Sequence, residues 1–294
     1  MTADGLTSRL AIPRKFLFHY STLSECFKTL IIQERNIKVT KDGRSETEPQ
    51  QMLRPSAFVA SVVPNKVFDP QHHVAFGDVF LENHMSAFED EIEAITHGAG
   101  LPDRGNQGWI TLAGKDLLNL ANHWLAAVPA NLSPGTGICG VRVEEISNNP
   151  IDLYAEAGRL CIGLDRTGVE QALTRLRSQL PSTVFTLTNE TNCVGRIAVM
   201  GPDSRKLLQA LGVHDDQLLN IGEHMEIVII DEPVRVSRSD CAGPHGYDFI
   251  VQMESFNMIL AVICSWGVRL GMNLVPVGWN AVQETARQYP NRIL

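Results

Sequence analysis

The segment 237–248 gathers residues that could hold a polar ligand. Its side chains include Arg238, Asp240, His245 and Asp248, which are interspersed with two glycines and a proline ahead of a β-prone apolar stretch. Glycine lets the backbone approach a ligand closely, and charged groups at a strand entrance can bind one. The pattern fits either a ligand-binding loop or a charged hairpin turn.

Two further motifs favour structural roles over chemistry. Residues 135–140 read GTGICG, which matches G-x-G-x-x-G, but the β-prone stretch Val141–Val143 follows where a dinucleotide site needs a helix. We therefore expect a turn that enters a strand. His72, His73 and His97 lack the spacing of a metal site such as H-E-x-x-H, so we predict structural or surface histidines and no metal centre.

The composition is that of an ordinary globular protein with 44% hydrophobic and 20% charged residues. A formal net charge of −8 argues against bulk attraction to nucleic acid or anionic lipid, so we predict neither partner. The longest apolar stretch, Met258–Val268, is interrupted by Ser265 and Gly267 and predicts a core helix. The six cysteines include no C-x-x-C pair, so we expect free thiols and a cytoplasmic location.

The chain divides into two parts of different character. Residues 1–75 form a predicted N-terminal extension, in which residues 38–51 are polar enough to suggest a linker. Residues 76–294 form the predicted main domain. We can predict no chemistry for the extension.

The main domain contains an internal repeat. The pattern G-x-I-x-h-x-G-x-D, where h is apolar, occurs at Gly108–Asp116 and again at Gly195–Asp203, an offset of 87 residues. The same offset pairs several apolar residues further along, so we predict repeat units at 108–180 and 195–267. Each unit is expected to contain strand, helix, two strands and helix. The predicted fold class is α+β, with two pseudo-symmetric units, antiparallel sheets and a ligand cleft between the halves.

The elements of the first unit are expected at 109–113 (strand), from 116 (helix), 138–146 and 154–164 (strands), and 167–180 (helix). The second unit is expected to place strands at 197–200, 225–230, 234–238 and 247–252, and helices at 202–211 and 255–266. Alternation of apolar residues indicates the strands, and apolar residues three and four apart indicate the helices.

Several passages, in order, resemble the folate-binding family of the glycine-cleavage T protein, an aminomethyltransferase. These passages are Gly98–Asp103, Gly108–Asp116, Ile197–Leu208, Ser237–Phe249 and Pro276–Ala281. The resemblance covers roughly residues 76 to 290 and implies the family's fold. Because no counterpart of the family's C-terminal barrel follows, we expect a divergent member without it. The K-G-C-Y-x-G-Q-E signature of the iron–sulfur-repair branch does not occur.

The resemblance implies a cleft that binds tetrahydrofolate or the related tetrahydromethanopterin, with an aspartate that assists one-carbon transfer. Two residues compete for that catalytic role. Asp152 ends a turn, Asn149–Asp152, that resembles the family's G-G-x-I-D turn, whereas an ungapped alignment brings Glu145 near the same place. The sequence leaves both open.

The same resemblance implies a set of cofactor-binding residues. They are Arg238, Gly243, His245, Gly246, Tyr247, Asp248 and Arg287. Two neighbouring positions depart from the family pattern. Pro244 replaces the glutamate that binds the pterin, and Cys241 replaces a tyrosine. The family's last-helix arginine falls on Ala286, and Arg287 matches only after a slip of one residue, which rotates a helical side chain by about 100°.

These observations leave three hypotheses for the function. The first is a one-carbon or aminomethyl transferase that uses a reduced pterin, which predicts an open polar cleft with a carboxylate facing the ligand. The second is a non-catalytic pterin-binding protein or a structural subunit of a one-carbon complex similar to sarcosine oxidase, which predicts a cleft without those anchors. The third is an unrelated α+β scaffold with a similar duplication.

Overall fold

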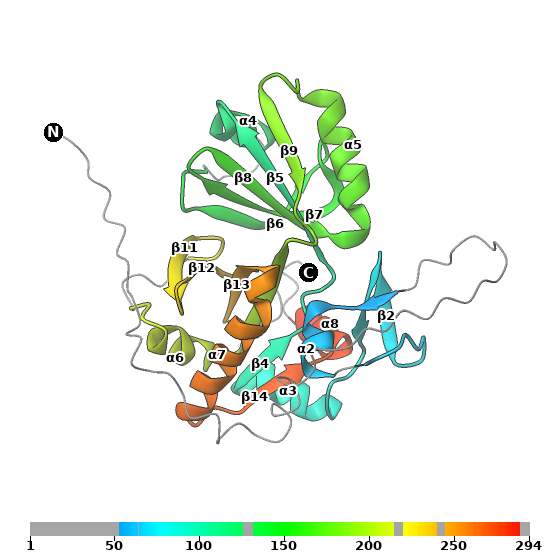
Figure 1. Cartoon of the computed structure of the whole chain (residues 1–294), viewed down its shortest axis with the longest axis vertical. Coiled ribbons are helices and arrows are strands. Elements are labelled where there is room, and N and C mark those ends of the chain that lie inside the picture. The colour runs from blue at the N-terminus through cyan, green and yellow to red at the C-terminus, as the bar shows by residue number, and fades with distance from the viewer. Residues whose placement is uncertain (1–52, 64, 126–131, 215–219, 240–244, 289–294) are drawn as a thin grey trace, which may run out of the picture.

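The computed structural model of the protein describes residues 53–63, 65–125, 132–214, 220–239 and 245–288. Two repeated units form most of the structure (Figure 1). The first unit contains β5 (Gln107–Gly114), α4 (Leu117–Trp124), β6 (Gly137–Val143), β7 (Ser147–Glu156), β8 (Arg159–Asp165) and α5 (Val169–Gln179). The second contains β10 (Val194–Met200), α6 (Ser204–Ala210), β11 (His224–Ile229), β12 (Glu232–Arg238), β13 (Gly246–Gln252) and α7 (Phe256–Arg269).

Strand pairing shows that the units are duplicates. In the first unit β5 pairs antiparallel with β8, with Gln107 opposite Asp165. In the second unit β10 pairs antiparallel with β13, with Val194 opposite Gln252, and both positions are displaced by 87 residues. Short 3-10 turns before α5 and α7 obey the same offset. The 87-residue offset of the sequence pattern therefore holds for the register of the paired strands as well.

The described strands of each unit belong to a separate sheet. The first sheet has the order β6-β7-β8-β5-β9, in which β9 (Phe185–Asn189) connects the units. The second has the order β11-β12-β13-β10-β4-β14, with β4 at Ala99–Pro102 and β14 at Leu274–Val277. The predicted α+β class with antiparallel sheets is thus present, and β14 adds one parallel pairing with β4.

One face of each sheet is covered by the helices of its own unit. In the first unit Ile110 and Leu112 are fully buried in a cluster that includes Leu173 of α5. Their equivalents Ile197 and Val199 are fully buried in a second cluster beneath α6 and α7. Burial of each such side chain contributes roughly 1.5–3 kcal/mol to the stability of the fold, so these two cores fix each sheet against its helices.

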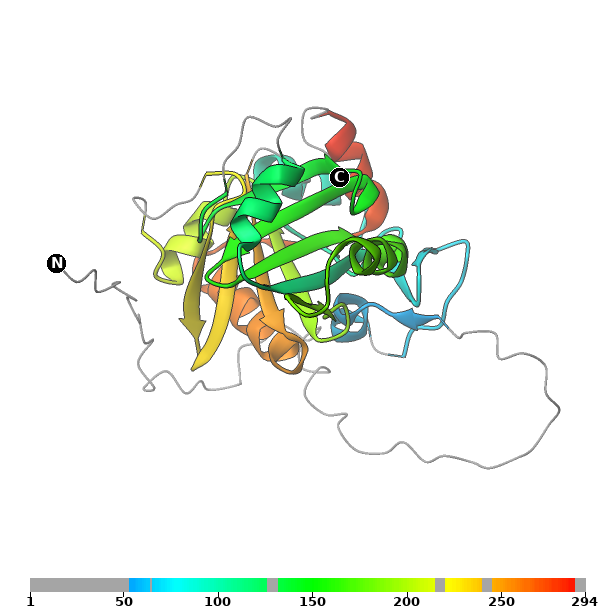
Figure 2. The ribbon, with the colours of Figure 1, turned by 90° about the horizontal axis from the view of Figure 1, so that it is seen from above.

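The opposite faces of the two sheets meet each other. Figure 2 shows the five-stranded sheet lying over the strands of the second unit, with α4 and α5 on its outer side. A small apolar cluster of Trp109, Tyr154, Cys161 and Ile250 lies between the sheets, joining residues from both units. Side chains alternate between the two faces of a strand. The residues that alternate with Ile110 and Leu112 along β5 therefore face this interior instead of the helices.

The remaining elements enclose the sides of this sandwich. Along the chain these are β1 (Arg54–Pro55), α2 (Ala57–Val62), β2 (His73–Phe76), β3 (Val79–Glu82), α3 (Phe88–His97) and α8 (Trp279–Gln288). α3 and α8 pack on Ala198 and Met200, which lie on the inner face of the second sheet. Phe58 of α2 belongs to the core of the second unit, and the predicted boundary at residues 75 and 76 lies inside β2. The predicted linker at 38–51 lies outside the described residues.

The first unit differs from expectation in one respect. The predicted strand 154–164 is two strands, β7 and β8, joined by a turn at Gly158 with φ +76°. A positive φ is accessible to glycine at little cost, so a single glycine is enough to reverse the chain. Each unit consequently has three strands after its first helix. Among the described residues, no helix is both long and apolar enough to cross a membrane.

Candidate functional site

The interior between the sheets contains a buried charged cluster centred on Arg196 of β10. The Nη2 atom of Arg196 donates to Oδ2 of Asp248 on β13 at 2.5 Å, and its Nη1 atom donates to Oε1 of Gln107 at 3.1 Å. Oδ2 of Asp152 on β7 lies 3.5 Å from the same Nη1. One guanidinium therefore connects carboxylates from both repeat units.

The two carboxylates of the cluster differ in their access to solvent. The side chain of Asp248 is 0% exposed, whereas that of Asp152 is 17% exposed. Oδ1 of Asp152 also accepts the backbone N–H of Gly140 at 3.0 Å, which fixes the orientation of the carboxylate. Asp152 is therefore the acid of this cluster that an incoming ligand can reach.

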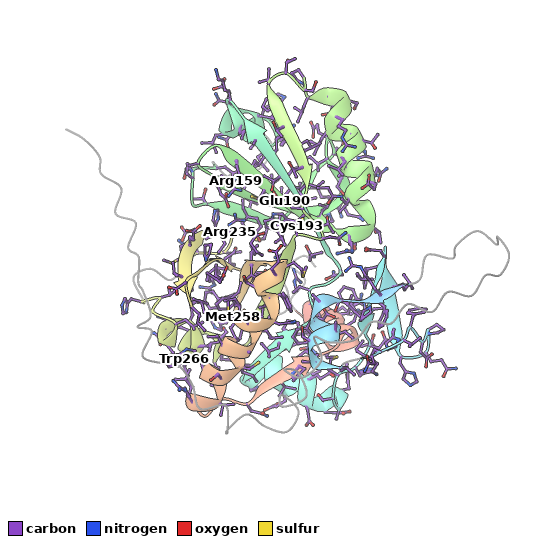
Figure 3. All side chains as sticks on the ribbon, in the orientation of Figure 1. Arg159, Glu190, Cys193, Arg235, Met258 and Trp266 are labelled. Carbon is purple, nitrogen blue, oxygen red and sulfur yellow. The ribbon has the colours of Figure 1, made fainter. Side chains whose placement is uncertain are left out.

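Aromatic and cationic side chains line the rest of the interior. The guanidinium carbons of Arg196 and Arg235 each lie 5.8 Å from the centroid of the Trp109 ring, within range of a cation–π interaction. Tyr154 stacks on Trp109 with ring centroids 5.6 Å apart. Arg235 also forms an ion pair with Glu156 and lies where the upper unit meets the lower one (Figure 3).

The contacts across this interior repeat the internal symmetry. Trp109 and Arg196 occupy the same position of the two units, 87 residues apart. Asp152 pairs with Gly163, and Arg235 pairs with Ile250, the equivalent of Gly163. The contact of Asp152 with Arg196 is thus the counterpart of the contact of Arg235 with Trp109, and an approximate two-fold axis passes through the cluster.

The opposite charges of the cluster keep one another ionised in spite of burial. Burial by itself disfavours a charged carboxylate, but the guanidinium groups of Arg196 and Arg104 outweigh it and lower the pKa of Asp248. Burial likewise opposes the charge of Arg196, and Asp248 with its neighbours raises the pKa of Arg196 well above its usual value. Burial raises the pKa of Cys139 and of Tyr154, so both stay neutral beside these ions.

Some predicted cofactor-binding residues join this interior directly. Asp248 is its buried carboxylate, and Gly246 begins the same strand. Tyr247 points to the opposite side, into the core of the second unit, and Arg238 at the end of β12 lies with its guanidinium carbon 5.9 Å from the Tyr247 ring centroid. An added Cβ on Gly246 would meet Sδ of Met200 at 2.2 Å, which explains why glycine occupies this position.

Other predicted site residues lie away from the cluster or outside the described residues. Glu145 is exposed in the turn between β6 and β7, where its carbonyl accepts a hydrogen bond from Gln179. Arg287 is exposed at the end of α8 and pairs with Glu284 at 3.3 Å, because the slip of one residue turns it away from the buried face. His245 is exposed. Gly243 lies outside the described residues.

The glycines of the motif at 135–140 pack between the two units. The backbone N–H of His224 donates to the carbonyl of Gly135 at 3.1 Å. A Cβ on Gly222 would lie 2.2 Å from the carbonyl oxygen of Gly137, so only glycine allows this approach. The expected turn into a strand is present, since Gly137 begins β6.

The three histidines singled out in the sequence have ordinary partners. His72 pairs with Asp69 and His97 with Glu93, both on the surface, whereas His73 is buried 3.3 Å from Glu82. In the described part of the chain no group of three or more metal-ligating side chains could hold a metal ion.

Sequence reasoning missed the arginine at the centre of the site. Arg196 occupies a variable position of the repeated strand pattern, although a charged residue in an otherwise apolar strand is a signal of a buried ion pair. Trp109 occupies the same variable position in the first copy of the pattern. The hydrogen-bond partners of Arg196 are 44 to 89 residues away in sequence, so only strand register brings them together.

A cavity of about 40 Å³ opens beside Trp109 and Arg196. Pockets for drug-sized ligands measure about 300–1,000 Å³, so this cavity is too small for a bicyclic ring system. It lies on the side of the cluster that faces β1 and α2.

The fold and site described above define a duplicated sandwich with a charged interior, and comparison with known proteins identifies its family. The chain belongs to the family of the GCVT N-terminal domain, whose model matches residues 39–287. This membership excludes the hypothesis of an unrelated scaffold.

The relatives agree with this assignment. An aminomethyltransferase of Bacillus velezensis is 26% identical over 219 residues, which cover 73% of this chain and 58% of the relative. An aminomethyltransferase of Thermosipho melanesiensis is 22% identical over 199 residues, which cover 67% of this chain and 53% of the relative. The chain thus spans little more than half the length of these relatives.

A solved structure shares the fold. The glycine cleavage system aminomethyltransferase T from Bartonella henselae superposes with a TM-score of 0.57 at 15% identity, over 73% of this chain and 57% of that chain. This similarity supports the predicted folate-binding aminomethyltransferase-like fold.

Proposed function

We propose that the protein binds a reduced pterin, tetrahydrofolate or tetrahydromethanopterin, as a one-carbon transferase of the aminomethyltransferase type. Membership of the family and the names of its relatives support this class of function. A bound reduced pterin would supply the atoms that carry the one-carbon unit. The protein would supply the polar groups that hold it.

The observation that carries the proposal is the position of Asp152. Its carboxylate lies at the solvent side of the buried cluster, oriented by Gly140 and by Arg196. A fixed carboxylate of this kind can accept hydrogen bonds from the N–H groups of a pterin and can stabilise positive charge near them. Asp152 lies in the charged cluster, whereas Glu145 lies in the exposed turn between β6 and β7, which gives Asp152 priority for the catalytic role.

Calorimetric titration with each pterin tests this proposal. We expect saturable binding to the unmodified protein and at least tenfold weaker binding to Asp152→Asn, because a hydrogen bond to a charged group contributes about 1.5–3 kcal/mol. Glu145→Gln is the matched control, since its exposed side chain lies at the far end of the hairpin. Unchanged affinity in Asp152→Asn would reject the role of Asp152.

A second candidate is a non-catalytic member of the family that acts as a structural subunit. Two observations favour it. The cavity beside Arg196 is about 40 Å³, and Arg287, one of the predicted cofactor-binding residues, pairs with Glu284 in solvent. This candidate predicts that the folded protein takes up neither pterin at millimolar concentration. That result would also reject the transferase proposal.

A further inference from the structure

The cavity beside the charged cluster is lined by several arginines. It lies where β1 and α2 meet the start of β5 and the strand β10, and its lining includes Arg54, Ser56, Asp103, Arg104, Arg166 and Arg196. Arg54 has a side chain that is 50% exposed, so the cavity reaches solvent beside it. The deep end reaches Trp109 and Arg196.

Arg104 is the most unusual residue of this cavity. Its side chain is only 4% exposed, and its nearest carboxylate oxygen, Oδ1 of Asp248, lies 3.9 Å from Nε. That Nε has no hydrogen-bond partner among the residues that the structure describes. Oδ1 of Asp248 likewise has no hydrogen-bond partner among the described residues, so the two groups attract each other only across this 3.9 Å gap. Burying a guanidinium is costly unless its N–H donors are bound, so an acceptor that enters the cavity would be bound favourably by Arg104.

The mouth of the cavity carries a surplus of positive charge. Arg54 and Arg166 share a single carboxylate, Asp78, at 2.9 Å and 2.5 Å. Both arginines also donate to the neutral side-chain oxygen of Asn192. Two guanidinium groups for one carboxylate leave one positive charge at the entrance, which attracts an anion.

The acid that lines the cavity is already engaged. Oδ2 of Asp103 accepts the hydroxyl of Ser56 at 2.6 Å, and Oδ1 accepts the backbone N–H of Gly105 at 2.8 Å. Burial raises the pKa of this carboxyl to about 6, so most of it is ionised at neutral pH. The two donors that bind its oxygens reduce its repulsion of an anion, and lowering the pH toward 6 reduces that repulsion further.

Size and geometry then select the class of anion. One water molecule needs about 10–15 Å³ of such volume, so about 40 Å³ accommodates roughly three heavy atoms. A carboxylate group has three heavy atoms and matches the planar fork of a guanidinium, whereas tetrahedral phosphate has five.

We propose that this cavity binds a small carboxylate, held by Arg104 inside and attracted by Arg54 and Arg166 at the mouth. The ligand is either a free acid of the size of formate or the terminal carboxylate of a longer molecule that enters beside Arg54. The site does not depend on pterin binding, because its residues differ from those proposed to hold the pterin, apart from the shared wall of Arg196.

Thermal unfolding in sodium formate tests the site, with sodium chloride at equal ionic strength as the reference. A ligand that binds only the folded state raises Tm in a saturable manner. We expect such a rise for the unmodified protein and at least a tenfold weaker apparent affinity for Arg104→Met. Arg54→Gln should weaken binding several-fold, and because this residue is half exposed the variant keeps the experiment informative if Arg104→Met does not fold.

The matched control is Arg159→Gln, which removes an exposed arginine that pairs with Glu156 and does not line the cavity. Its response to formate should equal that of the unmodified protein. An equal response of all variants, or saturation by phosphate but not by formate, would overturn the proposal. Acetate and butyrate distinguish the two sources of the carboxylate. An affinity that falls as the acid becomes longer indicates a free small acid as the ligand. An affinity that stays the same with longer acids indicates the terminal carboxylate of a longer molecule.

Discussion

Asp103 is a buried acid whose protonation should be visible in the stability of the protein. Burial raises its folded-state pKa from 3.8 to about 6, against the opposing hydrogen bonds from Ser56 and Gly105. The folded protein therefore binds this proton more tightly than the unfolded chain does. Its contribution to stability is fully present below about pH 4 and is lost as the pH rises to about 6.

We predict that the free energy of unfolding falls by about 2–3 kcal/mol between pH 4 and pH 6 because of this one group. In Asp103→Asn the difference in unfolding free energy between pH 4 and pH 6 should be smaller by that amount, since asparagine does not titrate. Urea unfolding of both proteins at several pH values measures it. Asp78, whose pKa is lowered to about 2, acts only at more acidic pH, so it does not obscure the comparison. An unchanged slope in the variant would contradict the assignment.

At the scale of elements, the turn before β11 depends on a close backbone contact. Gly222 has φ +85°, and a Cβ there would lie 2.2 Å from the carbonyl oxygen of Gly137 in the other unit. Gly158, in the turn between β7 and β8, has φ +76°, but a Cβ there meets nothing within 4 Å. The two glycines therefore share a positive φ, which any other residue would adopt with strain, and they differ only in packing.

This difference gives a matched pair of substitutions. Gly158→Ala should cost about 1 kcal/mol of unfolding free energy, which is the price of a left-handed backbone in alanine. Gly222→Ala should cost about 3 kcal/mol or more, because the backbone of β6 must also move. Urea unfolding of both variants measures the two losses of unfolding free energy. Equal losses would show that the two units are not held together at this contact.

The elements were largely predictable because the duplication supplies the same information twice. The matching patterns at Gly108 and Gly195 located β5 and β10, and the offset then fixed the helices α5 and α7. The turn at Gly158 was missed, since a single glycine inside an apolar stretch resembles a gap in one long strand. In the site, Asp152 and Asp248 could be named from the resemblance, but Arg196 could not, because its partners depend on strand register.

At the scale of the whole molecule, Arg196 joins the two units electrostatically. We predict that Arg196→Met lowers the unfolding free energy by about 3–5 kcal/mol, because it leaves Asp248 buried without its nearest counter-charge. Adding Asp248→Asn should recover most of the loss. A denaturant titration of the single and double variants measures both effects.

Arg159→Met is the control for this substitution, because it removes the same side chain from a half-exposed ion pair with Glu156. Exposed pairs contribute about 0–1 kcal/mol, so this variant should remain close to the unmodified protein. If both arginine variants lose the same stability, the buried cluster does not join the units.

The pairing of Trp109 with Arg196 bears on how such a molecule could arise from a gene duplication. In an isologous dimer of two identical single units, the residue at this position would face its own copy across the axis. Two arginines there would repel each other, and two tryptophans would leave the buried carboxylates without a counter-charge. Fusion into one chain lets the two copies diverge, so the asymmetric pair at the centre of the protein is an arrangement that a symmetric ancestor could not have contained.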